Sequence, residues 1–187
     1  MPFLPDPALR FSHPVNRGVV SFLRCQAARA AAAQPAAASD QAAAPDQAAP
    51  PPTGPAEAAG APVTADGFLL HTHASLCRRL WEACAGLPEP CEALLYGVAL
   101  LAARGIIFAL AFGAGPGEDW LAVRLAAGDA SSAYRAGAEP DMGLGDDWLC
   151  LDPWQAEGPD AAAQGCLAYW LARAYQNALA LPERPFG

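Results

Sequence analysis

The chain has 187 residues, a formal net charge of −8 and no lysine. Residues 1–25 carry three arginines against one aspartate, residues 26–65 one arginine against three carboxylates, and residues 66–187 seven arginines against fifteen carboxylates. An acidic domain repels phosphate groups and anionic lipid surfaces. We therefore expect no nucleic-acid partner and no adsorption to an anionic membrane, whereas a basic protein partner is compatible with this charge.

Composition also indicates the compartment and the source. The complete use of arginine in place of lysine, with abundant alanine, is typical of a GC-rich genome and favours a bacterial protein, although a selected escape from lysine modification is an alternative. Residues 1–10 contain prolines and an acid and lack the apolar run of a secretory signal. Six cysteines are too few for a disulfide scaffold, so we predict a cytoplasmic protein with reduced thiols.

Hydrophobic residues divide the chain into three segments. Between Leu23 and Phe68 there is no Phe, Trp, Tyr, Leu, Ile or Met, so this stretch cannot bury a core. The sequence predicts an N-terminal interaction segment over 1–25, a disordered Ala/Pro-rich linker over 26–65, and a compact α+β domain over 66–187. The earliest part of the linker, to about residue 33, is able to continue a preceding helix.

The N-terminal segment is expected to contain one short amphipathic helix. Val19, Phe22 and Leu23 follow the i, i+3, i+4 spacing of a single apolar stripe, and Asn16 is placed to cap the helix. A helix this short is marginal alone in water. It therefore docks either in cis on the C-terminal domain or in trans on a partner, and the sequence leaves both open.

The C-terminal segment predicts a helix, a meander and a final helix. The first helix, 73–86, places Leu76, Cys77, Leu80, Trp81 and Cys84 on its buried face, with Thr72 as a possible cap. The fold class is α+β, a small antiparallel sheet of three to four strands packed on one face by two or more helices. The predicted segments are 93–101 (strand or helix), 106–112, 120–126, a short helical turn over 131–135, 147–152 and a helix over 161–181.

An almost wholly apolar run over 93–113 permits a second interpretation. It is long enough for a membrane helix, and a membrane-associated protein is an alternative function. Arg104 lies near its middle, where a charge costs about 2.5–3.5 kcal/mol on insertion scales. Buried strands explain the run without that cost.

Candidate ligands and nucleophiles are few. His71, His73, Cys77 and Cys84 are weak candidates for a zinc site or a Cys/His enzyme, because the close Cys pairs of structural zinc sites are absent. Residues 113–117 read GAGPG, but a strand-like segment follows, so we predict a hairpin and not a dinucleotide site. The carboxylates near 141–152 lack calcium-loop spacing. We predict no catalytic residue, no metal and no cofactor; the weaker carboxylate candidates are Asp141, Asp146, Asp147 and Asp152.

Two tryptophans close to a loop are the remaining candidates. Trp148 and Trp154 bracket Cys150 and Pro153, and aromatics this dense are typical of an interface anchor or of a core. The predicted order of helix, meander and helix is similar to that of acidic bacterial secretion chaperones, a resemblance of architecture that no motif carries. The sequence favours a non-catalytic interaction factor, an adaptor, accessory protein or secretion-type chaperone, whose contacts are Val19, Phe22, Leu23, Trp148 and Trp154.

Overall fold

The computed structural model describes residues 9–33, 70, 72–113, 119–141, 143–154 and 167–182. Within these residues the protein is α+β, as predicted, with an antiparallel sheet of six strands where the sequence predicted three to four. The helices are α1 (Pro14–Ala33), α2 (Ala74–Cys84), α3 (Ala127–Arg135) and α5 (Leu167–Ala180). The strands are β1 (Cys91–Leu95), β2 (Val98–Ala103), β3 (Ile106–Phe112), β4 (Trp120–Arg124), β5 (Glu139–Pro140) and β6 (Trp148–Leu151).

Two tight hairpins account for part of the larger sheet. Tyr96 and Gly97 have φ of 53° and 82°, and Arg104 and Gly105 have φ of 49° and 78°. Two consecutive residues with positive φ form the turn that matches the twist of a β-hairpin. The segment predicted as one strand or one helix over 93–101 is therefore the end of β1, a turn and the start of β2. Tyr-Gly is a weaker turn signal than Asn-Gly, which is why the sequence hides this break.

Strands β4, β6 and β5 make up the second half of the sheet, where the spatial order differs from the chain order. The strand order is β1-β2-β3-β4-β6-β5, so β6 pairs with β4 and β5 adds outside it. Helix α3 fills the connection between β4 and β5. The two-residue β5 is the strand that the sequence did not predict at all.

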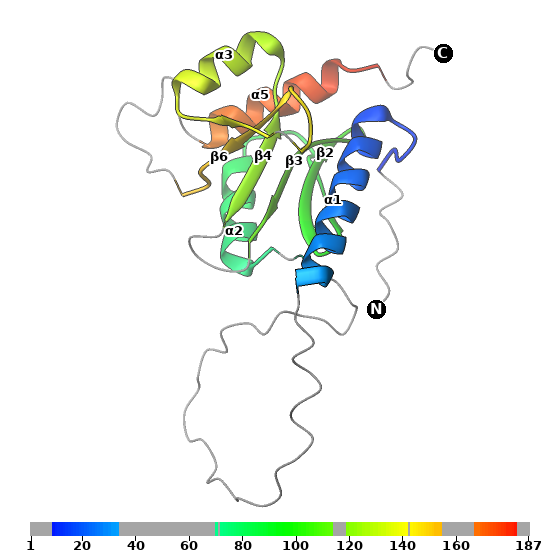
Figure 1. The fold of residues 1–187 in the computed structure, drawn as a ribbon. Coiled ribbons are helices and arrows are strands. Elements are labelled where there is room, and N and C mark those ends of the chain that lie inside the picture. The colour runs from blue at the N-terminus through cyan, green and yellow to red at the C-terminus, as the bar shows by residue number, and fades with distance from the viewer. Residues whose placement is uncertain are drawn as a thin grey trace, which may run out of the picture.

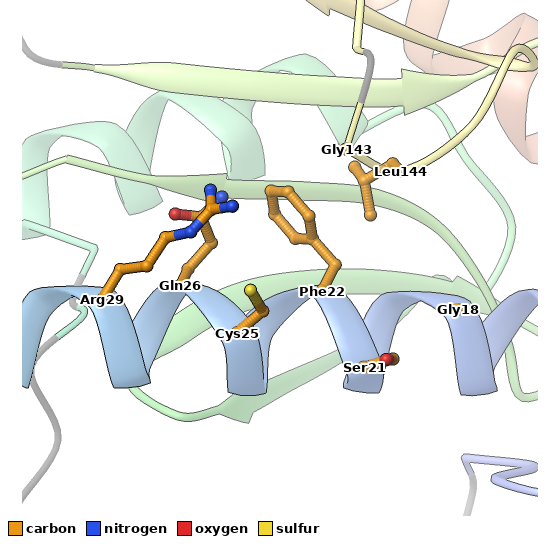
Figure 2. Close-up of a pocket in the computed structure, with 8 residues that line it drawn as sticks. All are labelled: Gly18, Ser21, Phe22, Cys25, Gln26, Arg29, Gly143 and Leu144. Carbon is orange, nitrogen blue, oxygen red and sulfur yellow. The ribbon is translucent and has the colours of Figure 1, made fainter.

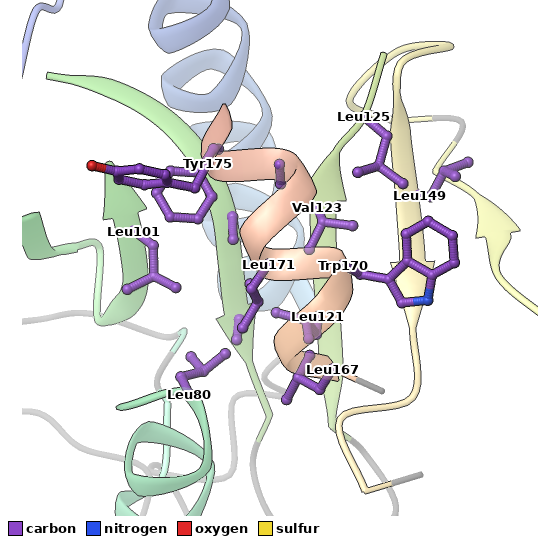
Figure 3. Packing of buried hydrophobic residues seen from close by; sticks show 14 of the residues in the cluster. Leu80, Leu101, Leu121, Val123, Leu125, Leu149, Leu167, Trp170, Leu171 and Tyr175 are labelled. Atoms are coloured by element: carbon purple, nitrogen blue, oxygen red, sulfur yellow. The ribbon is translucent and has the colours of Figure 1, made fainter. Parts of the chain in front are cut away.

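Both faces of the sheet are covered, whereas the sequence predicted helices on one face. On one face α2, α3 and α5 pack against Leu101, Leu121 and Val123, and Figure 3 shows Leu171 and Trp170 of α5 reaching into this layer. On the other face α1 is the one described helix that covers Leu100, Leu110 and neighbouring side chains (Figure 1). Because both faces are buried, β2 and β3 read as continuous apolar runs and not as alternating strands.

Polar residues at the start of α1 fix it to the sheet. Pro14 occupies the first helical position, and the ring Nδ1 of His13 accepts a hydrogen bond from the backbone N–H of Val15 at 3.3 Å. The predicted cap, Asn16, instead lies inside the helix and fully buried. Its amide donates to the carbonyls of Arg10 and Gly105 at 3.0 and 2.6 Å and accepts from the N–H of Ile107 at 2.8 Å. Asn16 is therefore the polar anchor of α1.

The apolar stripe of α1 is buried beside that anchor. Val19 and Leu23 are fully buried and Phe22 nearly so, all three in the cluster between α1 and the sheet. In this structure the helix docks in cis, one of the two alternatives that the sequence left open. The helix ends at Ala33. The predicted linker lies outside the described residues from 34 onward, as do residues 1–8.

We expect His13 to make stability depend on pH. Burial lowers the pKa of His13 below its ordinary 6.5, and nearby arginines lower it further, while a hydrogen bond to the Pro182 carbonyl opposes this shift. The unfolded chain then takes up a proton that the folded chain resists, so the free energy of unfolding falls as pH drops below about 6.5. The arginines concerned are Arg124, Arg10 and Arg17.

Urea unfolding at about pH 7.5 and about pH 5.5 measures this effect. Wild type is expected to lose more stability between the two pH values than His13→Gln, which has no proton to gain. Equal losses in the two proteins would show that His13 is not the group responsible.

Candidate interaction site around Trp154

His73 occupies the junction between the sheet and α2. It is the cap of α2, in place of the predicted Thr72, and its Nδ1 accepts from the backbone N–H of Leu76 at 3.3 Å. Its Nε2 lies 2.7 Å from Oδ1 of Asp119, just before β4. Since Nδ1 is an acceptor, the neutral tautomer with its proton on Nε2 satisfies both hydrogen bonds.

Thr72 places His73 at this position. Its hydroxyl accepts from the N–H of Ala99 at 2.8 Å and donates to the carbonyl of Ala111. Its backbone N–H donates to the carbonyl of Gly97 at 2.9 Å. The segment leading into α2 is therefore fixed to β2 and β3.

Trp154 completes the cluster, and it lies three residues after the end of β6. Its ring stacks on His73 with centroids 6.3 Å apart and an interplanar angle of 10°. The indole N–H donates to Oδ2 of Asp119, and the backbone N–H donates to Oδ1 of Asp152 at 2.8 Å. Arg79 of α2 donates to the carbonyl of Pro153 at 3.1 Å. We call His73, Asp119 and Trp154 the Trp154 platform.

The platform joins a buried anchor to an exposed ring. The Asp119 side chain is 2% exposed, whereas Trp154 is 45% exposed. The carboxylate accepts from an imidazole and an indole at once, which satisfies both of its oxygens. The arrangement holds a large amphipathic side chain in one orientation at the surface.

The predicted zinc or Cys/His cluster is not assembled in the described residues. His71 lies outside them. Cys77 has its Sγ 3.9 Å from the carbonyl oxygen of Thr72, and burial, then Glu92, raises the pKa of its thiol. Burial raises the pKa of Cys84 to about 11. Across the part of the chain that the structure describes, no group of three or more His, Cys, Asp or Glu residues is arranged to hold a metal.

His73 also lacks the geometry of a general base. Both ring nitrogens are already engaged, one by a backbone donor and one by Asp119. A base needs a free lone pair within reach of the proton that it abstracts. The enzyme alternative therefore stays a prediction without a described arrangement behind it.

The carboxylate candidates have structural partners. Asp141 is buried, and its Oδ1 accepts from the N–H groups of Gly143 and Leu144 at 2.8 and 2.9 Å. Its Oδ2 lies 3.4 Å from the thiol of Cys150. Burial first, and then the Asp141 charge, raise the pKa of Cys150 to about 12. This thiol is therefore protonated at neutral pH and is a poor nucleophile.

The other three carboxylate candidates differ from Asp141 in their surroundings. Asp152 accepts from the backbone N–H of Trp154 at 2.8 Å. Asp147 pairs with Arg124 of β4. Asp146 is exposed. The GAGPG run, whose residues 114–117 lie outside the described set, is part of the connection from β3 to the antiparallel β4, as the hairpin prediction required.

The predicted contact residues fall into two groups. Trp148 is 3% exposed and packs with Val19, Phe22 and Leu23 in the cluster under α1, whereas Trp154 is exposed. Contact of the buried residues with a partner would require α1 to leave the sheet, so their role stays a prediction. Trp81, expected on the buried face of α2, is instead 54% exposed at the flank of that face.

Sequence reasoning missed Asp119. It lies two residues after the GAGPG run and has no spacing signal that links it to His73 or Trp154. The antiparallel pairing of β4 with β3 and with β6 brings it beside residues 46 and 35 positions away.

The apolar run over 93–113 forms strands β1 to β3 and not a helix. Among the described helices, none combines the length and the apolar character needed to cross a bilayer. No protein-family model, curated protein or solved structure matches the chain.

Proposed function

We propose that this protein is a non-catalytic interaction factor, an adaptor, accessory protein or secretion-type chaperone, that binds a protein partner through the Trp154 platform. One observation carries the proposal. Trp154 is 45% exposed and yet is held by a ring stack and two hydrogen bonds. Exposed aromatic side chains with fixed orientation are the residues that contribute most to protein interfaces.

The physical advantage lies in preorganisation. Ordering a rotamer-rich side chain at an interface costs about 0.5–1.5 kcal/mol. Asp119 and His73 fix the indole before any partner arrives, so this cost is already met in the free protein. An indole also offers a large apolar face to a partner while its N–H stays satisfied.

The charge of the chain indicates what kind of surface would approach the platform. With a net charge of −8, the protein attracts partners whose contact surface is basic. This long-range attraction accelerates encounter, whereas the ring contact sets the lifetime of the complex. Binding is therefore expected to weaken with salt mainly through the association rate.

Trp154→Ala tests the proposal in the full-length chain. Partners are captured from extract of the native cells, and the main partner is then purified and its affinity measured by calorimetry. Loss of an interface hot spot is expected to weaken binding by at least about thirtyfold. Asp119→Asn keeps the indole but removes one accepting oxygen, so a smaller loss is expected from the looser ring.

Trp81→Ala is the matched control. It removes a tryptophan of similar exposure on α2 that has no hydrogen bond or ring stack among the described residues. It is expected to leave affinity within about twofold. A partner bound equally by wild type and Trp154→Ala, or lost equally in both tryptophan variants, would overturn the assignment of the platform as the binding site.

A further inference from the structure

The outer surface of α1 has a charge opposite to that of the protein as a whole. Residues 9–33 contain Arg10, Arg17, Arg24 and Arg29 and no acidic residue, in a chain whose net charge is −8. Arg17, Arg24 and Arg29 are exposed. Within the described ranges, no hydrogen bond or ion pair engages these three side chains, and none belongs to the Trp154 platform.

The exposed groups form an ordered stripe. Arg17, Ser21 and Arg24 follow the i, i+4, i+7 spacing of one helix face, opposite the buried Val19 and Leu23. Seven residues at 1.5 Å rise place the two arginine Cα atoms about 10 Å apart along the axis. Acidic side chains one i, i+7 repeat apart on a helical ligand match that separation.

Hollows with mixed polar and apolar linings flank the stripe on both sides. One, of about 240 Å³, is lined by Phe11, Arg17, Val20, Ser21 and Arg24. The other, of about 360 Å³, lies between α1 and the loop before β6. Figure 2 shows Phe22 of α1 reaching toward Gly143 and Leu144, with Gln26 and Arg29 extending to the same side one and two turns on.

The larger hollow has a rigid wall. The Phe22 ring stacks on Trp120 with centroids 5.6 Å apart and an interplanar angle of 18°. A Cβ on Gly143 would lie 2.6 Å from the edge of the same ring, so only glycine permits this approach of the loop. The wall is therefore fixed by contacts on two sides of Phe22.

We propose that the outer face of α1 is a second binding site, for an acidic amphipathic peptide segment of a partner protein. Its carboxylates pair with Arg17, Arg24 and Arg29, and its apolar side chains enter the two hollows. Arginine pairs with carboxylates through two parallel N–H···O bonds, which orients the ligand as well as attracting it. This site is separate from the Trp154 platform and does not depend on it.

Charge favours a short peptide over a longer polyanion. At physiological salt, charges beyond about 8 Å are screened, so a peptide on α1 senses mainly the arginines. A nucleic acid extends past the stripe onto the acidic remainder and is repelled there. Phe11 and Val20 in one hollow, and Phe22 and Leu144 in the other, also offer apolar surface that a phosphate backbone does not bury.

The test selects ligands from a displayed library of 16-residue random peptides on the full-length protein. Enriched peptides are expected to combine Asp or Glu with Leu, Ile or Phe. The double variant Arg17→Glu with Arg24→Glu is expected to weaken binding of a synthetic enriched peptide at least about tenfold. Arg135→Glu, an exposed arginine on α3 that bonds only to Ser132 within the described residues, is the matched control and is expected to bind normally.

Cys25 gives a local readout of whether peptide occupies the site. It is exposed and lines the larger hollow, so bound peptide is expected to slow its alkylation by iodoacetamide.

Three outcomes would overturn the proposal. The selected peptides could lack acidic residues, the synthetic peptide could bind wild type and the double variant equally, or wild type could bind single-stranded DNA as tightly as the peptide. Self-association that the double variant abolishes would identify a second copy as the ligand instead. Trp154→Ala is expected to bind the peptide normally, so failure of one site is distinguishable from failure of the other.

Discussion

Asn16→Ala is expected to lower the free energy of unfolding by about 2–4 kcal/mol. The substitution removes three hydrogen bonds and leaves the N–H of Ile107 without its side-chain partner inside the cluster under α1, whereas the carbonyl of Gly105 still accepts from the N–H of Arg10. Each buried polar group left unsatisfied costs about 1–3 kcal/mol. Urea unfolding followed by circular dichroism measures the loss. The amide of Ile107 is expected to exchange with solvent faster than in wild type.

Asn177→Ala is the matched control for Asn16. The side-chain amide nitrogen of Asn177 is buried on α5 and has no hydrogen-bond partner among the described residues. Its removal is expected to change stability by no more than about 0.5 kcal/mol. If both variants lost stability equally, the anchor role of Asn16 would be rejected, because the loss would then be a general effect of removing an amide.

Local sequence patterns were sufficient to predict the helices and strands whose formation depends on residues close together in the sequence. The β-rich run over 106–112 predicted β3 with its observed bounds, and the apolar spacing of 161–181 predicted a helix that the structure describes from Leu167 to Ala180 as α5. Helix α1 continues to Ala33, where the alanine run predicted that it would. Periodicity and composition report burial along one segment: α5 buries one continuous face, whereas β3 is apolar throughout because both of its faces are buried.

The arrangement of those elements required information that one segment does not hold. Covering both faces of the sheet depends on where α1 docks, which Asn16 decides through contacts about 90 positions away. In the same way, Trp154 was predicted as a contact residue from aromatic density, but its partner Asp119 becomes adjacent only after the strands pair. The sequence therefore predicted the ring and missed the groups that hold it.

A β-bulge shows where strand alternation fails. Ala102 pairs with Ile107 and Leu101 with Ala109, so Phe108 is an extra residue in β3. Strict alternation would place Phe108 on the same face as Leu110. Instead Phe108 joins the cluster beneath α2 and α5, and Leu110 joins the cluster beneath α1. The bulge thus supplies each face of the sheet with a large side chain.

Phe108→Ala is expected to destabilise the protein by about 3–5 kcal/mol, the largest loss from any single substitution considered for this chain. The side chain is fully buried, and its ring meets the edge of Tyr175 on α5 with centroids 5.7 Å apart at 85°. Truncation leaves a cavity between β3 and α5 that the close-packed core cannot fill. Thermal and urea unfolding measure the loss, and Phe108→Leu, which keeps most of the volume, is expected to cost less than about 1.5 kcal/mol.

A double-mutant cycle isolates the ring contact from the cavity. Phe108→Leu and Tyr175→Leu are made singly and together, and the hydrogen bond from Tyr175 to the Pro88 carbonyl is lost in both arms and cancels. An edge-to-face pair is expected to give a coupling of about 0.5–1.5 kcal/mol. Zero coupling would mean that the two rings do not meet and that the bulge does not direct Phe108 toward α5. A coupling in the expected range would establish that one extra residue in β3 fixes the position of the helix that covers this face.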